Sequence, residues 1–154
     1  MFETIVWATD GSELADRALP LVTDLARANG SKIVAVHANE LLVGRFISGA
    51  PVLADEDELR AKVEQQVDEL REAGFTAELV VESGVRHSTA ELIAAAAAEC
   101  EADLIVVGTH GRGAATTALL GSVAKELLHV ARCPVLVVTP DRRESETPLS
   151  VKTA

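Results

Sequence analysis

Short apolar segments alternate with amphipathic helical segments along almost the whole 154-residue chain. The helical segments repeat their apolar residues every three or four positions, whereas the intervening segments are too short for helices and have the length of buried strands. The expected strands are Thr4–Thr9, Lys32–Ala38, Ala77–Val81, Asp103–Val107 and Pro134–Val138. This alternation predicts parallel strands joined by right-handed helical crossovers. We therefore expect an α/β domain with a doubly wound, five-stranded parallel sheet and helices on both faces.

The first helix is expected to be bent. It follows the turn Asp10-Gly11-Ser12, runs to the stop signal at Asn29-Gly30 and contains Pro20 in its interior. Proline lacks an N–H group and its ring clashes with the preceding turn, at a cost of about 3 kcal/mol in a straight helix. We therefore expect a kink at Pro20. The other helices are expected at about Glu56–Ala73, at about Thr89–Glu99 and over a segment that ends near Ala131.

Charge limits the partners of the chain. The formal net charge of -10 opposes broad contact with nucleic acid or with an anionic membrane, because phosphate contacts dominate such binding. No apolar run approaches the roughly 20 residues of a membrane span, and the first residues do not have the pattern of a signal peptide. We therefore expect a cytoplasmic protein that binds phosphate groups only at a local site.

Composition divides the chain into a folded part and a tail. Hydrophobic residues make up 48% of the chain and aromatic residues only 3%, so the core must be built from aliphatic side chains. Residues 1–140 form the expected domain, and residues 141–154 are a polar segment without periodicity, which predicts a mobile tail.

Cys100 and Cys133 have no metal-binding or redox spacing and are expected to be small buried residues. The loop Asn39–Asp55 is a candidate lid.

Three strand ends are candidate ligand sites, because ligands of doubly wound sheets lie outside the carboxyl ends of the strands, where the strand order reverses. These ends are Thr9-Asp10, His37-Ala38-Asn39 and the segment from Gly108 onward. The Asp10 carboxylate can accept hydrogen bonds from a sugar or cap the first helix. The main chain at Ala38 has groups that can pair with a base edge. We expect His37 to be a structural histidine whose hydrogen bonds are satisfied.

The segment GTHGRGAATTALLGS, from Gly108 to Ser122, has the spacing G-x2-G-x9-G-S. Glycines permit positive φ, so that successive N–H groups can surround a phosphate. Ser122 begins a helix, which places its hydroxyl and the N–H groups of the first turn, Val123 included, beside that anion. The alternative is a glycine-rich turn in which Ser122 is an ordinary helix cap. His110 and Arg112 either reach the phosphate or remain solvated.

The spacing excludes two common nucleotide motifs. A Walker A loop needs a lysine after the last glycine, and the G-x-G-x-x-G dinucleotide turn follows the first strand. Together with TDGS, VHA, ADLIVVGTHGRG, LLGSVAKELL and CPVLVV, the segment resembles the universal stress protein family, and the resemblance extends from Phe2 to about Thr139. It implies the adenine nucleotide alpha hydrolase-like fold, with strand order 3-2-1-4-5.

The resemblance also implies a ligand. The family's ATP-binding branch carries G-x2-G-x9-G-[S/T], matched here by Gly108, Gly111, Gly121 and Ser122. By this resemblance Asp10 contacts adenosine, the main chain at Ala38 reads the adenine edge, and the glycines hold the phosphates of ATP, with the role of Mg²⁺ left open. The expected cofactor-binding residues are Thr9, Asp10, Ala38, Gly108, His110, Gly111, Arg112, Gly121, Ser122 and Val123. Where many members have a Gly-x-Pro turn after the third strand, this chain has Gly84-Val85-Arg86-His87-Ser88, which leaves the pocket wall near the ribose undetermined.

The function expected is that of an ATP-binding stress-response module that acts through a protein partner, hydrolyses little ATP and forms a homodimer through Pro134–Val138. One alternative is an interaction protein of the same family with an empty cleft or a cyclic nucleotide. An adenylating or ATP-hydrolysing enzyme would need SGGxDS after the first strand or HIGH-like histidines, and here that turn reads TDGSEL. A receiver domain would need an aspartate at the end of the third strand, where this chain has Glu82-Ser83.

Overall fold

The computed structural model describes residues 1–40, 53–84, 86–109 and 120–139. Most of the loop Asn39–Asp55 and the whole tail of residues 141–154 lie outside these ranges. In chain order the elements are β1 (Thr4–Ala8), α1 (Glu13–Asp16), α2 (Leu19–Asn29), β2 (Lys32–Glu40), α3 (Leu53–Glu72), β3 (Ala77–Gly84), α4 (Thr89–Glu99), β4 (Leu104–Gly108), α5 (Ser122–Val130) and β5 (Val135–Val138). Every helix in the described ranges is too short or too polar to cross a lipid bilayer.

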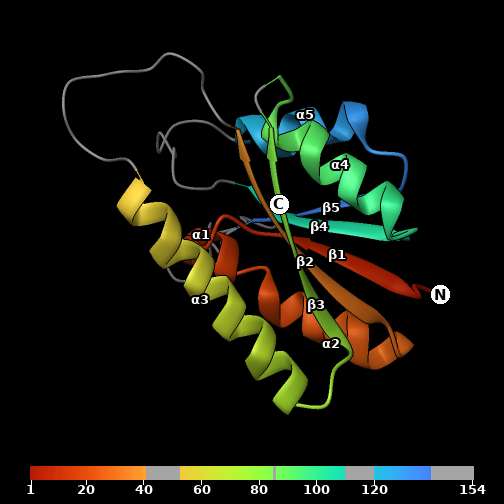
Figure 1. Cartoon of the computed structure of the whole chain (residues 1–154). Coiled ribbons are helices and arrows are strands. Elements are labelled where there is room, and N and C mark those ends of the chain that lie inside the picture. Colours follow the sequence, from red (N-terminus) through yellow and green to blue (C-terminus); the bar gives the residue numbers. More distant parts are fainter. Residues whose placement is uncertain (41–52, 85, 110–119, 140–154) are drawn as a thin grey trace, which may run out of the picture.

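The strands form one parallel sheet in the order β3-β2-β1-β4-β5 (Figure 1). This order confirms the predicted fold class. The central strand β1 is buried on both faces, and its residues Ile5 to Ala8 are at most 3% exposed. Strands in that position must be apolar throughout. The strand order reverses at β1, because β2 and β3 lie on one side of it and β4 and β5 on the other.

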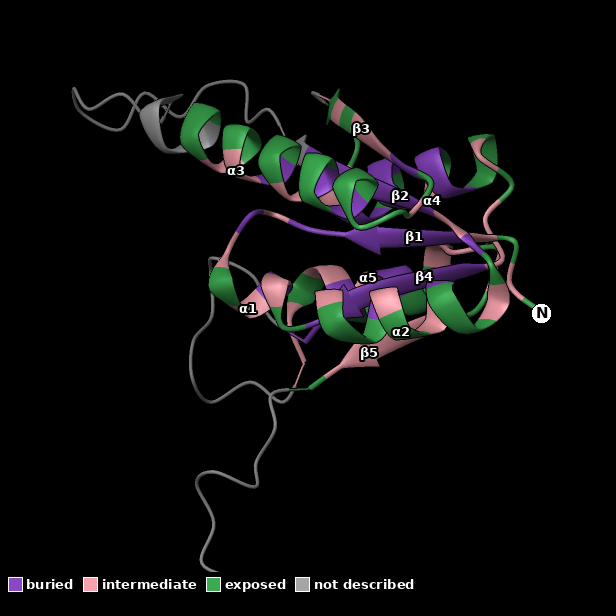
Figure 2. Cartoon of the chain, turned by 90° about the horizontal axis from the view of Figure 1, so that it is seen from below, coloured by how far each residue is buried: buried purple, intermediate pink, exposed green. Residues whose placement is uncertain are grey.

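Two helical layers cover the sheet, α4 and α5 on one face and α1, α2 and α3 on the other (Figures 1 and 2). Successive residues of β1 enter opposite layers: Val6 packs in the core under α4 and α5, and Trp7 packs under α2 and α3. Three alanines of α4, namely Ala90, Ala96 and Ala97, are buried against the sheet. Figure 2 shows β1, β2 and β4 mostly in the colour of buried residues, between the two layers. The predicted arrangement of helices on both faces is confirmed.

The expectation of one bent helix with a kink at Pro20 was wrong. The structure has two helices, because α1 ends at Asp16 and α2 starts at Leu19 with Ala18 as its N-cap. Pro20 therefore lies in the first turn of α2, where backbone N–H groups have no partner within the helix. The missing N–H of proline removes no helical hydrogen bond there.

Several element ends differ from the sequence prediction. Strands β2 and β3 run on to Glu40 and Gly84, which pair with each other, because ladder hydrogen bonds do not require apolar side chains. Strand β5 begins at Val135 instead of Pro134, since proline has no N–H to give to the ladder. The carbonyl oxygen of Pro134 still accepts the N–H of Ile105 at 2.9 Å. Helix α3 begins at Leu53, a few residues earlier than expected.

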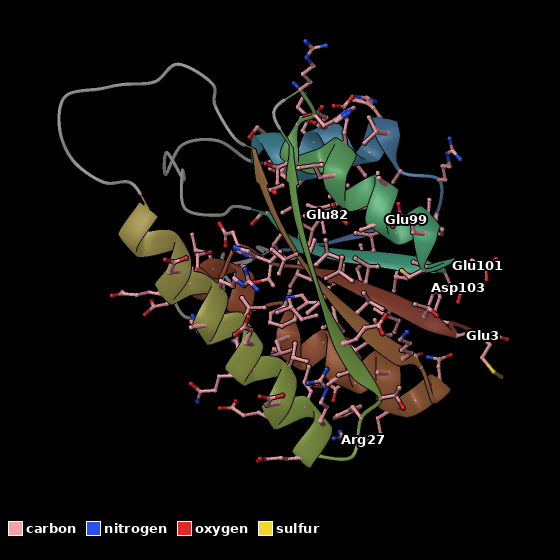
Figure 3. The ribbon with its side chains drawn as sticks, in the orientation of Figure 1. Glu3, Arg27, Glu82, Glu99, Glu101 and Asp103 are labelled. Atoms are coloured by element: carbon pink, nitrogen blue, oxygen red, sulfur yellow. The ribbon has the colours of Figure 1, made fainter. Side chains whose placement is uncertain are left out.

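The amino ends of β1 and β4 are joined by a carboxylate. Asp103 accepts the N–H groups of Glu3 and Thr4 at 2.7 and 2.9 Å, at the end of the sheet where Figure 3 labels Glu3, Glu101 and Asp103. The N–H of Thr4, and next that of Glu3, lower the pKa of Asp103 because both bonds favour the charged carboxylate. This end of the sheet is opposite to the predicted ligand site.

The two cysteines are free thiols that pack against the core under α4 and α5. Cys100 and Cys133 are each half-buried, so the prediction of small packed residues is confirmed but the expected full burial is not. Desolvation is the largest cause that raises the pKa of both thiols. A raised pKa keeps a thiol protonated and unreactive at neutral pH.

Candidate functional site

The carboxyl ends of the central strands lie side by side. Ala8 pairs with Val36 of β2 and with Val107 of β4, so the residues that follow these strands leave the sheet at the same edge. Figure 1 shows the N-terminus of α5 at this edge. The topology thus brings together three of the sequence-predicted regions, around Asp10, Ala38 and Gly108.

The turn after β1 is held by its own side chains. The hydroxyl of Thr9, a buried residue, accepts the N–H of Gly11 at 3.1 Å, and the Asp10 carboxylate accepts the N–H of Ser12 at 3.0 Å. The predicted capping role belongs to Ser12, whose hydroxyl accepts the N–H of Ala15 as the N-cap of α1. Asp10 is therefore not the helix cap, and its half-buried carboxylate belongs to the turn that precedes the helix.

Helix α3 clamps this turn from outside. The Lys62 ammonium donates to the carbonyl oxygen of Gly11 at 2.8 Å and forms an ion pair with Asp16. Gln66 donates to the same carboxylate at 2.9 Å. Gly11 has φ of +77°, and a Cβ atom there would lie 3.0 Å from both the Cβ and the main-chain oxygen of Leu59. Sequence reasoning missed Leu59 and Lys62, because periodicity does not reveal which turn a helix packs against.

The end of β2 carries a buried histidine next to Ala38. His37 is 0% exposed, and its Nδ1 lies 3.1 Å from the carbonyl oxygen of Thr9. The N–H of Thr9 donates to the carbonyl oxygen of Val36 at 3.0 Å. The prediction that His37 is a satisfied structural histidine is confirmed. Both main-chain groups of Thr9 are thereby bonded to β2.

Thr109 closes the glycine-rich segment. It follows Gly108, the last residue of β4, and its N–H donates to the carbonyl oxygen of Val138 at 3.0 Å. Its own carbonyl oxygen accepts the N–H of Gly121 at 2.6 Å. One hydrogen bond therefore brings the first and last parts of the G-x2-G-x9-G-S segment together. Sequence reasoning missed Thr109 because its contribution comes from the main chain and not from its side chain.

The N-terminus of α5 has no side-chain cap. The N-cap is Gly121, with φ of -68° and ψ of 161°, and Ser122 is the first residue of the helix. The alternative in which Ser122 caps the helix is therefore wrong, because Ser122 lies one position too late. The first bond of the helix joins the N–H of Lys125 to the carbonyl oxygen of Gly121. The N–H groups of Ser122, Val123 and Ala124 donate to no group in the described part of the chain.

Helix α4, which begins near the same edge, differs in this respect. Its N-cap Ser88 forms a capping box with Glu91: the Ser88 hydroxyl accepts the N–H of Glu91, and the Glu91 carboxylate accepts the N–H of Ser88. The Ser88 hydroxyl also donates to Glu126 of α5 at 2.7 Å. Of these two helices, α5 is the one whose N-terminus has no side-chain cap.

Three predicted site residues, His110, Gly111 and Arg112, lie outside the described residues. The other predicted positions are placed at one edge of the sheet: Thr9, Asp10, Ala38, Gly108, Gly121, Ser122 and Val123. Within the described ranges, no group of three or more His, Cys, Asp or Glu side chains could hold a metal ion.

Comparison with known proteins places the chain. The model of the universal stress protein family matches residues 1–139. The chain belongs to the universal stress protein family. A universal stress protein of Thermus aquaticus is 35% identical over 146 residues, which cover 90% of this chain and 99% of the relative.

Solved structures of this family have the same fold. The structure of protein MJ0577 matches with a TM-score of 0.68 at 28% identity, covering 91% of this chain and 97% of the other. Universal stress protein MJ0577 comes from Methanocaldococcus jannaschii. A universal stress protein solved in complex with cAMP matches with a TM-score of 0.66 at 28% identity, covering 89% and 97% of the two chains. The sequence resemblance to the universal stress proteins and its implied nucleotide alpha hydrolase-like fold are confirmed.

Because α3 packs against the turn after β1, we expect Gly11→Ala to cause a large loss of unfolding free energy. Alanine pays about 1–2 kcal/mol for left-handed φ, and the contacts with Leu59 add to this cost because a helix main chain cannot easily move. Gly30→Ala is the matched control, since Gly30 has φ of +70° with no atom within 4 Å of a new Cβ. Urea denaturation should show a larger loss of unfolding free energy for Gly11→Ala than for Gly30→Ala. Equal losses would mean that α3 does not constrain the turn.

Proposed function

We propose that this universal stress protein binds an adenine nucleotide, ATP in the first instance, at the edge where β1, β2 and β4 end. The observation that carries the proposal is the uncapped N-terminus of α5, which the Thr109–Gly121 hydrogen bond holds next to the end of β4. A helix N-terminus attracts anions through its free N–H groups and its dipole. Gly108, Gly121, Ser122 and Val123 are the described residues that would hold the phosphates, and Gly111, His110 and Arg112 complete the proposed site.

The adenosine part of the ligand is assigned to the ends of β1 and β2. Thr9 and Asp10 form a turn fastened to both β2 and α3, which gives a carboxylate a constant position for hydroxyl groups of a ribose. Ala38 contributes main-chain groups at the end of β2. The cAMP complex of a structural neighbour supports a nucleotide as the class of ligand, and it makes a cyclic nucleotide the second candidate.

The proposed role is regulatory. The proposed phosphate site at the N-terminus of α5 consists of main-chain N–H groups, which stabilise a phosphate without activating a water molecule for attack. We infer that nucleotide occupancy changes how the protein contacts a protein partner, and that turnover by the protein alone is slow.

Substitution at the N-cap of α5 tests the nucleotide site. Gly121→Asp introduces a good helix cap with a negative charge, so it should stabilise α5 while repelling phosphate. Isothermal titration calorimetry, with and without Mg²⁺, should show ATP binding to the wild type and affinity roughly tenfold or more weaker for Gly121→Asp. Gly121→Asn is the control, because it caps the helix without the charge.

The same titration separates the candidate ligands. Tighter binding of cAMP than of ATP would favour the cyclic nucleotide. No heat and no thermal protection at millimolar concentrations of either nucleotide would contradict the proposal and leave an interaction protein without a nucleotide.

Turnover is expected to stay below the range of ordinary enzymes. Phosphate release from ATP by the purified protein, measured at saturating nucleotide with Mg²⁺, should be far slower than about 1 per second. A steady-state rate at or above that value would show that the site holds a general base, and the regulatory proposal would then be wrong.

We also propose a homodimer formed through β5. This strand is an edge of the sheet, and all of its residues, Val135 to Val138, are only half-buried. An apolar edge strand with unpaired main-chain groups favours pairing with another strand. A second copy of the chain offers the same strand, which gives a self-complementary two-fold contact. The opposite edge, β3, is less suited because it carries Glu78 and Glu82.

Replacing Leu136 with lysine should convert the dimer to a monomer. The new charge would lie in the partly buried apolar layer under α2 and α3, next to the proposed contact between two copies of β5, and the same holds for Val138→Lys. Sedimentation velocity at tens of micromolar measures the mass, and Val81→Lys on the edge strand β3, where Val81 is 39% exposed, is the matched control. A wild-type monomer would contradict the dimer, and a dimer that tolerates Leu136→Lys would place the interface elsewhere.

A further inference from the structure

The hydrogen-bond ladder between β1 and β2 stops one bond early. In a parallel sheet, every second residue of a strand forms its main-chain hydrogen bonds with the same neighbouring strand. Here Lys32 donates to Glu3 at 2.8 Å and Val36 accepts from Thr9 at 3.0 Å, so the next bond of the series would join the N–H of Ala38 to the carbonyl oxygen of Thr9. The described residues contain no such bond. The Thr9 carbonyl oxygen lies instead 3.1 Å from Nδ1 of His37.

His37 bonds to the acceptor that the ladder would otherwise use. A carbonyl oxygen can accept two hydrogen bonds, so His37 acts by orienting the Thr9 carbonyl away from the Ala38 N–H and not by filling its acceptor sites. A carbonyl oxygen only accepts, so Nδ1 must carry the proton in this bond. The imidazole is 0% exposed and belongs to the residue directly before Ala38, which is itself 6% exposed. The Ala38 N–H is thereby left without the carbonyl of β1, although it lies almost fully buried. A buried N–H without an acceptor costs free energy unless a ligand satisfies it.

We propose that His37 is a positioning residue that ends the β1–β2 ladder and so keeps the N–H of Ala38 open for the acceptor atom of a nucleobase. This inference rests on the proposed function. Adenine presents a ring-nitrogen acceptor beside an exocyclic amine donor, which complements the N–H and carbonyl of one main-chain residue. Hypoxanthine presents a ring N–H and a carbonyl at the same positions, so its polarity is reversed. His37 therefore controls base selectivity without contacting the base.

Two variants separate the donor of His37 from its volume. His37→Phe keeps a ring and removes the donor, so the Thr9 carbonyl can turn toward the N–H of Ala38. His37→Asn keeps an N–H donor at about the distance of Nδ1 from the main chain. His129→Phe is the matched control, because His129 lies exposed near the end of α5.

The first measurement needs no nucleotide. Amide hydrogen exchange by NMR should show Ala38 less protected than Val36 in the wild type, and roughly five- to tenfold better protected in His37→Phe, the effect of one added hydrogen bond. His37→Asn and His129→Phe should leave Ala38 unchanged. An Ala38 amide as protected as Val36 in the wild type would overturn the inference even if His37→Phe fails to fold.

The second measurement is base selectivity. The ratio of the Kd values for inosine triphosphate and ATP should fall by about tenfold in His37→Phe, remain near the wild-type value in His37→Asn and not change in His129→Phe. Binding of inorganic triphosphate should be the same in all four proteins. An equal loss of affinity for all three ligands would assign His37 a merely structural role and overturn the inference. If the wild type binds no adenine nucleotide, the proposed function fails, and the exchange of Ala38 alone decides whether His37 ends the ladder.

Discussion

The pairing of β1 with β2 on one side and with β4 on the other is the constraint on which the rest of the structure depends. It makes β1 the central strand, which the two helical layers bury on both faces, and it places the reversal of strand order at the carboxyl end of β1. Crossovers on the two sides of β1 must then lie on opposite faces of the sheet, since each crossover is right-handed. The chain consequently starts from the same edge after β1 and after β4 but continues to helices on opposite faces, α1 and α2 after β1 and α5 after β4.

Two threonine peptide groups hold the edge where these segments leave. Thr9 is bonded to β2 through both its N–H and its carbonyl, and Thr109 links Val138 of β5 to Gly121 at the start of α5. Apart from the His37 imidazole, these bonds join main-chain groups and require no large side chain. This explains why small residues gather here, since a side chain at Gly11 would collide with Leu59 and a side-chain cap at Gly121 would occupy the N–H groups of α5.

The charge of the chain gives this main-chain site its importance. A net charge of -10 repels phosphates from the surface as a whole, whereas N–H groups and a helix dipole act over short distances. The proposed nucleotide site would therefore bind phosphate through N–H groups at fixed positions and not through an overall positive charge. The family membership of the chain and the cAMP complex of a structural neighbour agree with a nucleotide ligand.

The amino-acid sequence by itself determined the strands, the helices on both faces and the family, because alternating apolar periodicity and the TDGS and G-x2-G-x9-G-S motifs are local patterns. It also located most candidate site residues, since the carboxyl ends of parallel strands meet at one edge. Local patterns misjudged Pro20, because they did not show that the chain breaks into two helices before it, and they left open whether Ser122 caps α5. Only the tertiary structure decided that Lys62 and Leu59 clamp the Asp10 turn, that Thr109 closes the glycine-rich segment and that His37 takes the carbonyl of Thr9. Each of these contacts joins residues distant in sequence, and their geometry arises only when the packed sheet brings the strand ends together.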